Sequence, residues 1–243
     1  MKFFVTDDKI ENNTITITGD DVVHIRDVLR LSESSIVKIC DGNYNDYTCE
    51  LISLTKKHAK FKIQSKAKNN AEPLVDVILY QSLPKNPKIE IIIQKCVEIG
   101  IKEIVFFPSE RSVQKIKDEM EIQKKLQRFN KISKAAAMQS GRGIVPNISF
   151  IPSFNMAISA TKNGVTIIAY EACKELTLKQ FMTSFCPVNM LNLIIGPEGG
   201  FTEAEINYAK NANATVVTLG KRILRTETAA IVTTAIVLNE LES

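Results

Sequence analysis

The sequence lacks the features of several large protein classes. No stretch approaches the roughly eighteen uninterrupted apolar residues of a membrane-spanning helix, so we expect no membrane partner. The apolar start of the chain meets Asp7 and Asp8 too early for a secretory signal peptide, which predicts a cytoplasmic protein. The chain has 5 cysteines, an odd number without a CxxC pair, which argues against a disulfide framework.

Metal-binding patterns are also missing. The chain contains 2 histidines, and no cluster of His, Cys or carboxylate residues has the spacing of metal ligands. We therefore expect no metal cofactor. The formal net charge of +4 is too small by itself to indicate a binding partner.

Basic side chains are concentrated in two parts of the chain. Between residues 84 and 143 they outnumber acidic side chains by about two to one. A second, acid-free stretch contains Lys56, Lys57, Lys60, Lys62, Lys66 and Lys68. Charge gathered in this way suits a face that binds a polyanion, and ordinary solvated lysines remain the alternative at this stage.

Residues 1–72 are expected to form a small β-rich domain. Strands are predicted at residues 14–18, 35–40, 47–54 and 59–64, with a short helix at 21–29. This pattern favours a partly closed barrel. The polar segment 66–72, followed by Pro73, predicts a linker.

Residues 73–243 have the pattern of an α/β domain. Helices are predicted at 89–97, ending at Gly100, and at 117–140. Strands are predicted at 74–80, 101–107, 147–151, 165–170, 191–195 and 215–219. Alternating strands and helices predict a parallel sheet covered on both faces, with ligands bound at the carboxyl ends of its strands.

The first notable strand end is the sequence GPEGGFT at residues 196–202. Its three glycines allow a close approach of the backbone to a ligand, and Thr202 with Glu205 predicts a capping box for the next helix. The loop lacks the Lys-Ser/Thr of a P-loop, and Glu198 would repel a phosphate. A ligand with hydroxyls, an amine or a cation is favoured, and a turn needed only for packing is the alternative.

A second strand end carries LGKRILRTETAA at residues 219–230. Arg225 follows a short excursion of the chain, and Thr226 is expected to cap a helix that runs through Leu238. A plain helix cap with surface charges is the alternative reading. A third strand end, Tyr170-Glu171, places an acid after an apolar strand and is a weak signal alone.

Together these loops resemble the two signature loops of the ribosomal RNA small subunit methyltransferase E family, in the SPOUT superfamily. The match is collinear over essentially the whole chain. Other matching segments are HIRDVLR at 24–30, Asp41-Gly42, Ile93-Gln94-Lys95, Glu98-Ile99-Gly100, Arg111 and Gly141-Arg142 before Pro146. Family members often carry a glutamate where this chain has Met138, and an arginine near the N-terminus where it has Lys2.

The resemblance implies an α/β protein of two domains. Residues 1–72 would form an RNA-binding PUA-like β-barrel. Residues 73–243 would form a SPOUT methyltransferase domain with a parallel sheet and a C-terminal trefoil knot, which binds the cofactor and mediates homodimerisation. The implied reaction transfers a methyl group from S-adenosylmethionine to N3 of a uridine in 16S ribosomal RNA of the 30S subunit.

The chemistry of the implied reaction suggests roles for residues of these loops, because a uridine N3 must lose its proton before it accepts a methyl group. Glu198 or Glu227 is the candidate base, and Arg225 is the candidate stabiliser of negative charge on the uracil. The cofactor-binding candidates are Tyr170, Glu171, Ile195, Gly196, Pro197, Gly199, Gly200, Leu219, Gly220, Leu224, Thr226, Thr228 and Ala229. The RNA-binding candidates are Lys2, Arg26, Arg30, Lys85, Arg111 and Arg142.

Two other classes of protein remain open. A non-enzymatic RNA-binding protein would keep the barrel and the basic face, and a nucleotide-binding α/β enzyme would catalyse an unrelated reaction. The intact GPEGG and RTETAA segments argue against the first class. The missing phosphate-binding lysine argues against the second.

Overall fold

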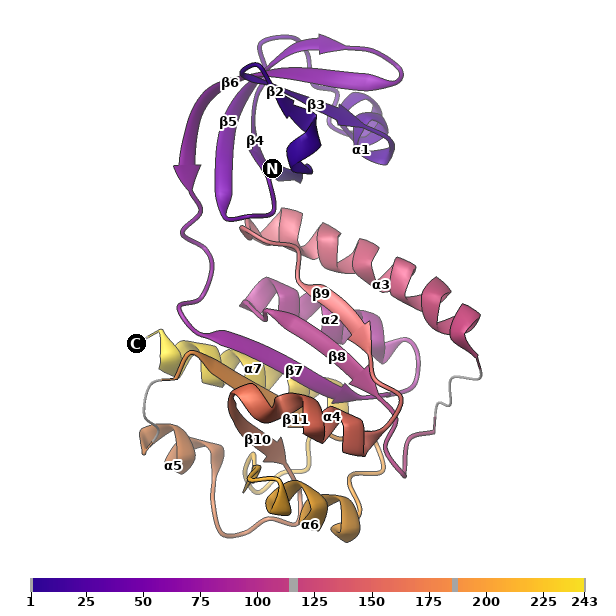
Figure 1. Ribbon diagram of the computed structural model, residues 1–243, viewed down its shortest axis with the longest axis vertical. Coiled ribbons are helices and arrows are strands. Elements are labelled where there is room, and N and C mark those ends of the chain that lie inside the picture. Colours follow the sequence, from indigo (N-terminus) through magenta and orange to yellow (C-terminus); the bar gives the residue numbers. More distant parts are fainter. Residues whose placement is uncertain (1, 114–117, 185–187, 243) are drawn as a thin grey trace. The chain divides into compact units, whose positions relative to one another are not determined.

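The computed structural model describes residues 2–113, 118–184 and 188–242 (Figure 1). The chain divides into an N-terminal unit, Met1–Glu72 with Ala137–Val145, and a C-terminal unit, Pro73–Ala136 with Pro146–Ser243. Residues 137–145 therefore belong to the N-terminal unit, whereas the sequence assigned them to the second domain. Among the described residues, no helix has the length and apolar character required to cross a membrane.

The N-terminal unit is built on one curled six-stranded sheet with the order β1-β4-β5-β6-β3-β2. Only the β1–β4 pair is parallel, and the other neighbours are antiparallel. No pairing among the described residues joins β1 to β2, so the sheet is a half-barrel, in agreement with the partly closed barrel that the strand pattern predicted. The strands are β1 (Lys2–Phe4), β2 (Ile10–Glu11), β3 (Thr14–Thr18), β4 (Ile36–Cys40), β5 (Asn45–Leu54) and β6 (His58–Lys68).

Buried and exposed side chains alternate along the first half of β6, so that one face of the sheet packs against the core. Ala59 and Phe61 are buried, whereas Lys60 and Lys62 between and after them are exposed. The predicted helix at 21–29 is α1 (Asp20–Val23), which continues directly into a π-helical turn, η2 (His24–Val28). A short 3-10 turn, η1 (Asp7–Lys9), precedes β2. The strands β1 and β2 were not predicted because each is too short to show a pattern.

The segment 66–72 is not the free linker that its polar composition predicted. Strand β6 extends to Lys68, and the Glu72 carboxylate lies 2.8 Å from Arg142 Nε and 2.7 Å from Arg142 Nη2. The backbone N–H of Gly143 also donates to Glu72, at 2.6 Å. These bonds fasten residues 137–145 to the N-terminal unit, where Met138 packs against the core of the half-barrel.

Lys2 makes a second buried connection within the same unit. Its Nζ lies 2.8 Å from Asp46 Oδ1 and donates to the carbonyls of Gly141 and Arg142, at 2.8 and 3.0 Å. Lys2 is 4% exposed and Arg142 is 2% exposed. Both cations were expected to bind RNA, but they are buried and already paired, so we assign them to holding this unit together.

The C-terminal unit contains a parallel six-stranded sheet with the order β12-β10-β11-β7-β8-β9. The strands are β7 (Asp76–Ser82), β8 (Glu103–Phe107), β9 (Asn147–Phe150), β10 (Val165–Ala169), β11 (Met190–Ile195) and β12 (Thr215–Val217). All were predicted to within a few residues. Leu74, predicted as strand, lies before β7 and is exposed. Because all the strands run in the same direction, their carboxyl ends share one edge of the sheet.

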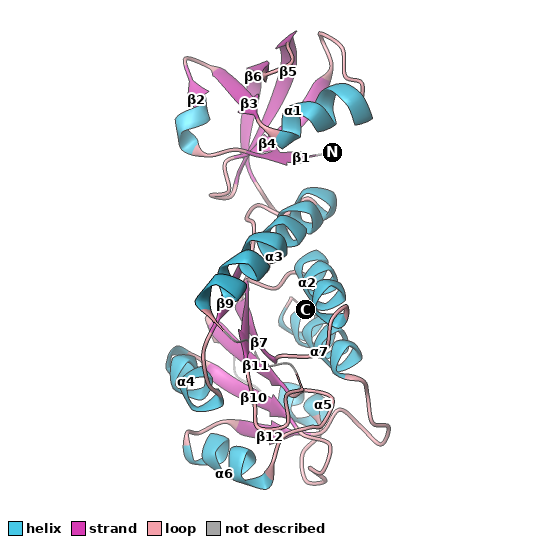
Figure 2. Cartoon of the chain, turned by 90° about the vertical axis from the view of Figure 1, so that its right-hand side faces the viewer, coloured by secondary structure: helices cyan, strands magenta, loops and turns pink. Residues whose placement is uncertain are grey.

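Helices cover both faces of this sheet (Figure 2). Helices α2 (Lys88–Ile99) and α7 (Thr226–Leu241) pack together on one face, and α4 (Phe154–Ala160) and α6 (Glu203–Asn211) pack on the other. The remaining elements are α3 (Glu119–Ser140), η3 (Thr161–Asn163) and α5 (Leu178–Thr183). Residue 117, the predicted start of α3, lies outside the described residues.

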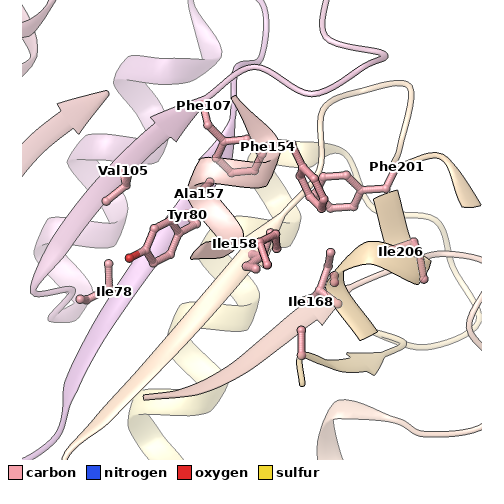
Figure 3. Close-up of a cluster of buried hydrophobic side chains, with 13 residues drawn as sticks. Ile78, Tyr80, Val105, Phe107, Phe154, Ala157, Ile158, Ile168, Phe201 and Ile206 are labelled. Atoms are coloured by element: carbon pink, nitrogen blue, oxygen red, sulfur yellow. The ribbon is translucent and has the colours of Figure 1, made fainter. Parts of the chain in front are cut away.

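An aromatic row anchors the loop that follows β11 (Figure 3). The rings of Phe107 and Phe154 are 6.0 Å apart, and those of Phe154 and Phe201 are 5.5 Å apart. Phe201 directly follows the GPEGG segment and is 1% exposed. Burying this ring removes a large apolar surface from water and holds the end of the loop against the sheet.

The buried pair of Glu72 and Arg142 yields a stability prediction. Glu72→Gln leaves the guanidinium beside a neutral amide, so the free energy of unfolding at neutral pH should fall by about 3 kcal/mol. Burial acts to raise the pKa of Glu72, but the Arg142 guanidinium and the backbone donors lower it below its usual value. The contribution is therefore present above the unfolded pKa and is lost as the pH falls through the folded pKa.

Urea unfolding of the two proteins across pH measures this contribution. Asp27→Asn is the matched control, because Arg26 and Asp27 form the same forked ion pair in the same unit but on its surface. It should change stability little. Equal effects of the two substitutions would contradict the importance of burial.

Candidate active site

A cavity of about 540 Å³ opens at the carboxyl ends of β10, β11 and β12. Its walls are residues 169–171, 195–201 and 218–226, joined by Lys88 and Ala229. The cavity lies at the strand-end edge where a parallel sheet places its ligands, and its size is that of a small-molecule site. All three strand ends singled out in the sequence meet here.

The predicted cofactor residues are almost all in the cavity wall. Those that line it are Tyr170, Glu171, Ile195, Gly196, Pro197, Gly199, Gly200, Leu219, Gly220, Leu224, Thr226 and Ala229. Thr228 does not line it and is exposed on α7. Of the predicted catalytic residues, Glu198 and Arg225 line the cavity, whereas Glu227 does not.

The loop after β11 is held in a tight turn. The N–H of Gly200 donates to the carbonyl of Pro197 at 3.0 Å, and Gly200 has a φ of +67°, where a side chain is disfavoured. A Cβ at Gly200 would also meet the carboxylate of Glu171. Thr202 and Glu205 form the predicted capping box at the start of α6. Glycine is therefore the favoured residue at this point of the cavity wall.

Thr226 has a different role from the one predicted. Arg225, with extended φ and ψ, is the N-cap of α7, and it makes no side-chain capping bond. The Thr226 hydroxyl instead donates to the carbonyl of Gly196 at 2.6 Å and accepts from Gln81 Nε2 at 3.0 Å. The threonine therefore joins the two signature loops through a partly buried hydrogen bond.

The buried polar groups at the end of β7 were not found from the sequence. Gln81, at 0% exposure, donates to Thr226. The hydroxyl of Ser82 lies 2.7 Å from that of Ser109 and 2.9 Å from that of Ser112. These bonds connect β7 to the segment that carries Arg111, whose Nη1 donates to the carbonyl of Gly199 at 3.2 Å. Polar residues at the end of an apolar strand are the signal that points to this cluster.

Lys88 is the main functional candidate that the sequence reading missed. Its Nζ lies 3.1 Å from Glu198 Oε1 and 3.1 Å from Glu227 Oε2. Burial acts to lower the pKa of Lys88, but the two carboxylates raise it above its usual value. Lys88 is the first residue of α2, about 110 residues before Glu198, and no local motif marks it.

Glu198 is strongly held by donors. It accepts from the backbone N–H of Lys85 at 3.1 Å as well as from Lys88. Burial acts to raise its pKa, but the backbone donors and Lys88 lower it below the usual value for glutamate. Glu198 is therefore ionised at neutral pH.

The predicted RNA-binding residues separate into two groups. Arg30, Lys85 and Arg111 are exposed, and Arg26 is half-buried in a fork with Asp27. Lys2 and Arg142 are buried in the N-terminal unit and do not have the exposure that a phosphate contact needs. In the described part of the chain, no three His, Cys, Asp or Glu side chains are grouped so as to hold a metal ion.

Comparison with known proteins identifies the family. Residues 70–238 match an RNA methyltransferase domain, and residues 17–64 match an RNA methyltransferase PUA domain. The chain is 35% identical to ribosomal RNA small subunit methyltransferase E of Bacillus subtilis, over 90% of this chain and 87% of the relative. The corresponding protein of Mesomycoplasma hyopneumoniae is 34% identical, over 95% of each chain.

Solved structures agree with the sequence relatives. The ribosomal RNA small subunit methyltransferase E of Neisseria gonorrhoeae bound to S-adenosyl methionine superposes with a TM-score of 0.82 at 29% identity, covering 97% of this chain and 95% of that chain. A putative methyltransferase of Legionella pneumophila in complex with the same cofactor gives 0.87 at 25% identity, covering 97% and 96%. The chain belongs to the ribosomal RNA small subunit methyltransferase E family of S-adenosylmethionine-dependent enzymes.

Proposed function

We propose that this chain methylates N3 of a uridine in 16S ribosomal RNA of the small ribosomal subunit, with S-adenosylmethionine as the methyl donor. The observation that carries the proposal is the cavity, whose walls are the two loops with the family's signature. The names of the relatives support small-subunit ribosomal RNA as the substrate. Intact cofactor loops favour catalysis over an RNA-binding protein without activity.

The cavity wall suits this cofactor. S-adenosylmethionine supplies an electrophilic methyl group on a positively charged sulfur. The backbone at Ile195, Gly196, Leu219 and Leu224 would bind the adenine and ribose, and neighbouring apolar side chains would contact the ring. Glu171 and Glu198 provide negative charge for a cationic ligand, as the chemistry of the loop predicted.

Arg225 and Glu198 are the proposed catalytic pair. Uridine N3 carries a proton that must leave before the nitrogen can accept a methyl group. Glu198 is preferred to Glu227 as the base because Glu198 lines the cavity, whereas Glu227 does not. Arg225 also lines the cavity, and its guanidinium would stabilise the negative charge that grows on the uracil carbonyls.

Exposed cations supply the proposed RNA-binding surface. In the C-terminal unit these are Lys85 and Arg111, and in the N-terminal unit they include Arg30. Arg26, which is half-buried in its fork with Asp27, is proposed as a further contact. The lysines of the acid-free stretch at residues 56–68 are all exposed on or beside β6. Phosphate contacts from such residues fix the position of RNA without reading its sequence.

We also propose that the protein acts in the cytoplasm on the 30S subunit and that its C-terminal unit contains the trefoil knot of the family. We further propose that the protein is a homodimer. Ile91 on α2 and Ile236 on α7 are 45% and 39% exposed, although the two helices pack against each other. A second copy that covers these side chains would remove apolar surface from water.

Gly200→Ala tests the cofactor site. The alanine is strained at positive φ by about 1 kcal/mol, and its Cβ meets Glu171 in the cavity wall. Affinity for S-adenosylmethionine, measured by calorimetry, should fall about tenfold or more. Gly42→Ala is the control, because Gly42 has a φ of +76° but open space around its Cβ. It should lose stability and keep its affinity; unchanged affinity in both variants would show that the cofactor binds elsewhere.

Arg225→Lys tests the catalytic role. The lysine keeps the charge but loses the rigid fork, so the single-turnover rate of 30S methylation should fall about a hundredfold at saturating cofactor. Arg222→Lys provides the control, since Arg222 is also exposed in the cavity wall. A near wild-type rate for Arg225→Lys would remove this residue from the mechanism.

The salt dependence of RNA binding tests the basic stretch. Replacing Lys56, Lys57, Lys60 and Lys62 together by glutamine should flatten the slope of log affinity against log salt, because fewer counterions are released. The control replaces four exposed lysines from other parts of the surface, namely Lys38, Lys174, Lys179 and Lys210. Equal slopes for the two variants would mean that residues 56–62 do not contact phosphate.

A further inference from the structure

One ammonium group connects three segments at the cavity. Lys88 begins α2, Glu198 lies in the loop after β11, and Glu227 lies in the first turn of α7. The three side chains are 22%, 24% and 17% exposed, so water screens their charges only in part. Lys88 and Glu198 line the cavity, and Glu227 is reached through Lys88.

The two carboxylates are close enough to affect each other. Each has an oxygen 3.1 Å from Lys88 Nζ, so these two oxygens are at most about 6 Å apart. Like charges at this distance oppose each other's ionisation, and a cation between them favours the charged form of both. Of the cations in the described part of the chain, only Lys88 is within ion-pair distance of either carboxylate.

The other charged groups around the cavity do not lie between the two carboxylates. Glu198 also accepts the backbone N–H of Lys85, whose side chain is exposed. Arg111 donates to the carbonyl of Gly199 and not to a carboxylate. The remaining charged residues of the wall are Glu171, Lys221, Arg222 and Arg225. None of these replaces Lys88 between Glu198 and Glu227.

We propose that Lys88 is a positioning residue for methyl transfer, which holds the carboxylates of Glu198 and Glu227 side by side through its ammonium group. The pair joins the GPEGG loop to the start of α7 beside Arg225, so the base and the charge stabiliser keep a constant spacing. The proposal rests on the proposed function, since it names a further residue of the same site. Its consequence is that Lys88 sets the lower pH limit of the reaction.

Titration of the cofactor-free protein tests the charge coupling directly. In Lys88→Met, nuclear magnetic resonance of ¹³C-labelled glutamate carboxyls should show Glu198 titrating about one pH unit or more higher than in the wild type, because the cation that lowers its pKa is gone. Lys88→Arg keeps the cation and should restore the wild-type titration. Lys88→Met combined with Glu227→Gln removes the like charge, so Glu198 should again titrate at lower pH. Unchanged titration in Lys88→Met would overturn the proposal.

A further variant tests the same coupling if Lys88→Met does not fold. Glu227→Gln in the presence of Lys88 should lower the pH at which Glu198 titrates, because Glu198 loses a neighbouring negative charge. If the titration of Glu198 does not respond to the loss of Glu227, the two carboxylates are not coupled and the proposal is wrong.

The rate of methyl transfer connects this coupling to function. At saturating S-adenosylmethionine, the acidic limb of the single-turnover profile should move to higher pH in Lys88→Met by the same amount as the carboxyl titration. In Lys88→Arg the acidic limb should return to its wild-type position. A merely structural lysine would lower the rate equally at every pH, which would refute the proposal. Absence of methylation by the wild type would instead refute the proposed function.

Discussion

The cavity depends on how residues 196–201 are held at the end of β11. Phe201 is buried in the aromatic row at one end of the loop, and the carbonyl of Gly196 accepts the Thr226 hydroxyl at the other. Between these anchors the backbone turns through Gly200 at positive φ. A loop fixed at both ends loses little further entropy when it binds a ligand, which is an advantage for a site that must align two reactants.

The polar groups beneath the loop explain why the two signature segments act as one site. Gln81 and Thr226 are buried, and their hydrogen bonds leave the ends of β7 and β11 tied to the start of α7. On the other side of the loop Arg111 donates to Gly199. Buried hydrogen-bond networks favour one arrangement of the chain. Each broken bond leaves a buried polar group without a hydrogen-bond partner, and water cannot reach the group to replace that partner.

Charge in the N-terminal unit is divided between interior and surface for a physical reason. The ammonium of Lys2 and the guanidinium of Arg142 are buried against carboxylates and carbonyls, where they hold residues 137–145 in place. The lysines of β6 instead alternate with the buried Ala59 and Phe61 and therefore face water. Only this second kind of cation is free to exchange its counterions for phosphates.

The parallel sheet, the N-terminal strands with one buried face and the two loops of the cavity could be predicted from the sequence, because the hydrophobic period and the position of glycines along the chain are local properties. Glycines 196, 199 and 200 were identified from their spacing and Arg225 from its place before a helix, and all four line the cavity.

The partners of charged and hydroxyl groups, in contrast, depend on the tertiary structure. The sequence does not show that Lys88 stands between Glu198 and Glu227, or that Thr226 bonds to Gly196 instead of capping α7. In the sequence, Lys2 and Arg142 cannot be distinguished from surface cations. The fold pairs Lys2 with Asp46 and Arg142 with Glu72. Such pairs form between residues far apart in the chain, and their energies depend on burial, which no local pattern records.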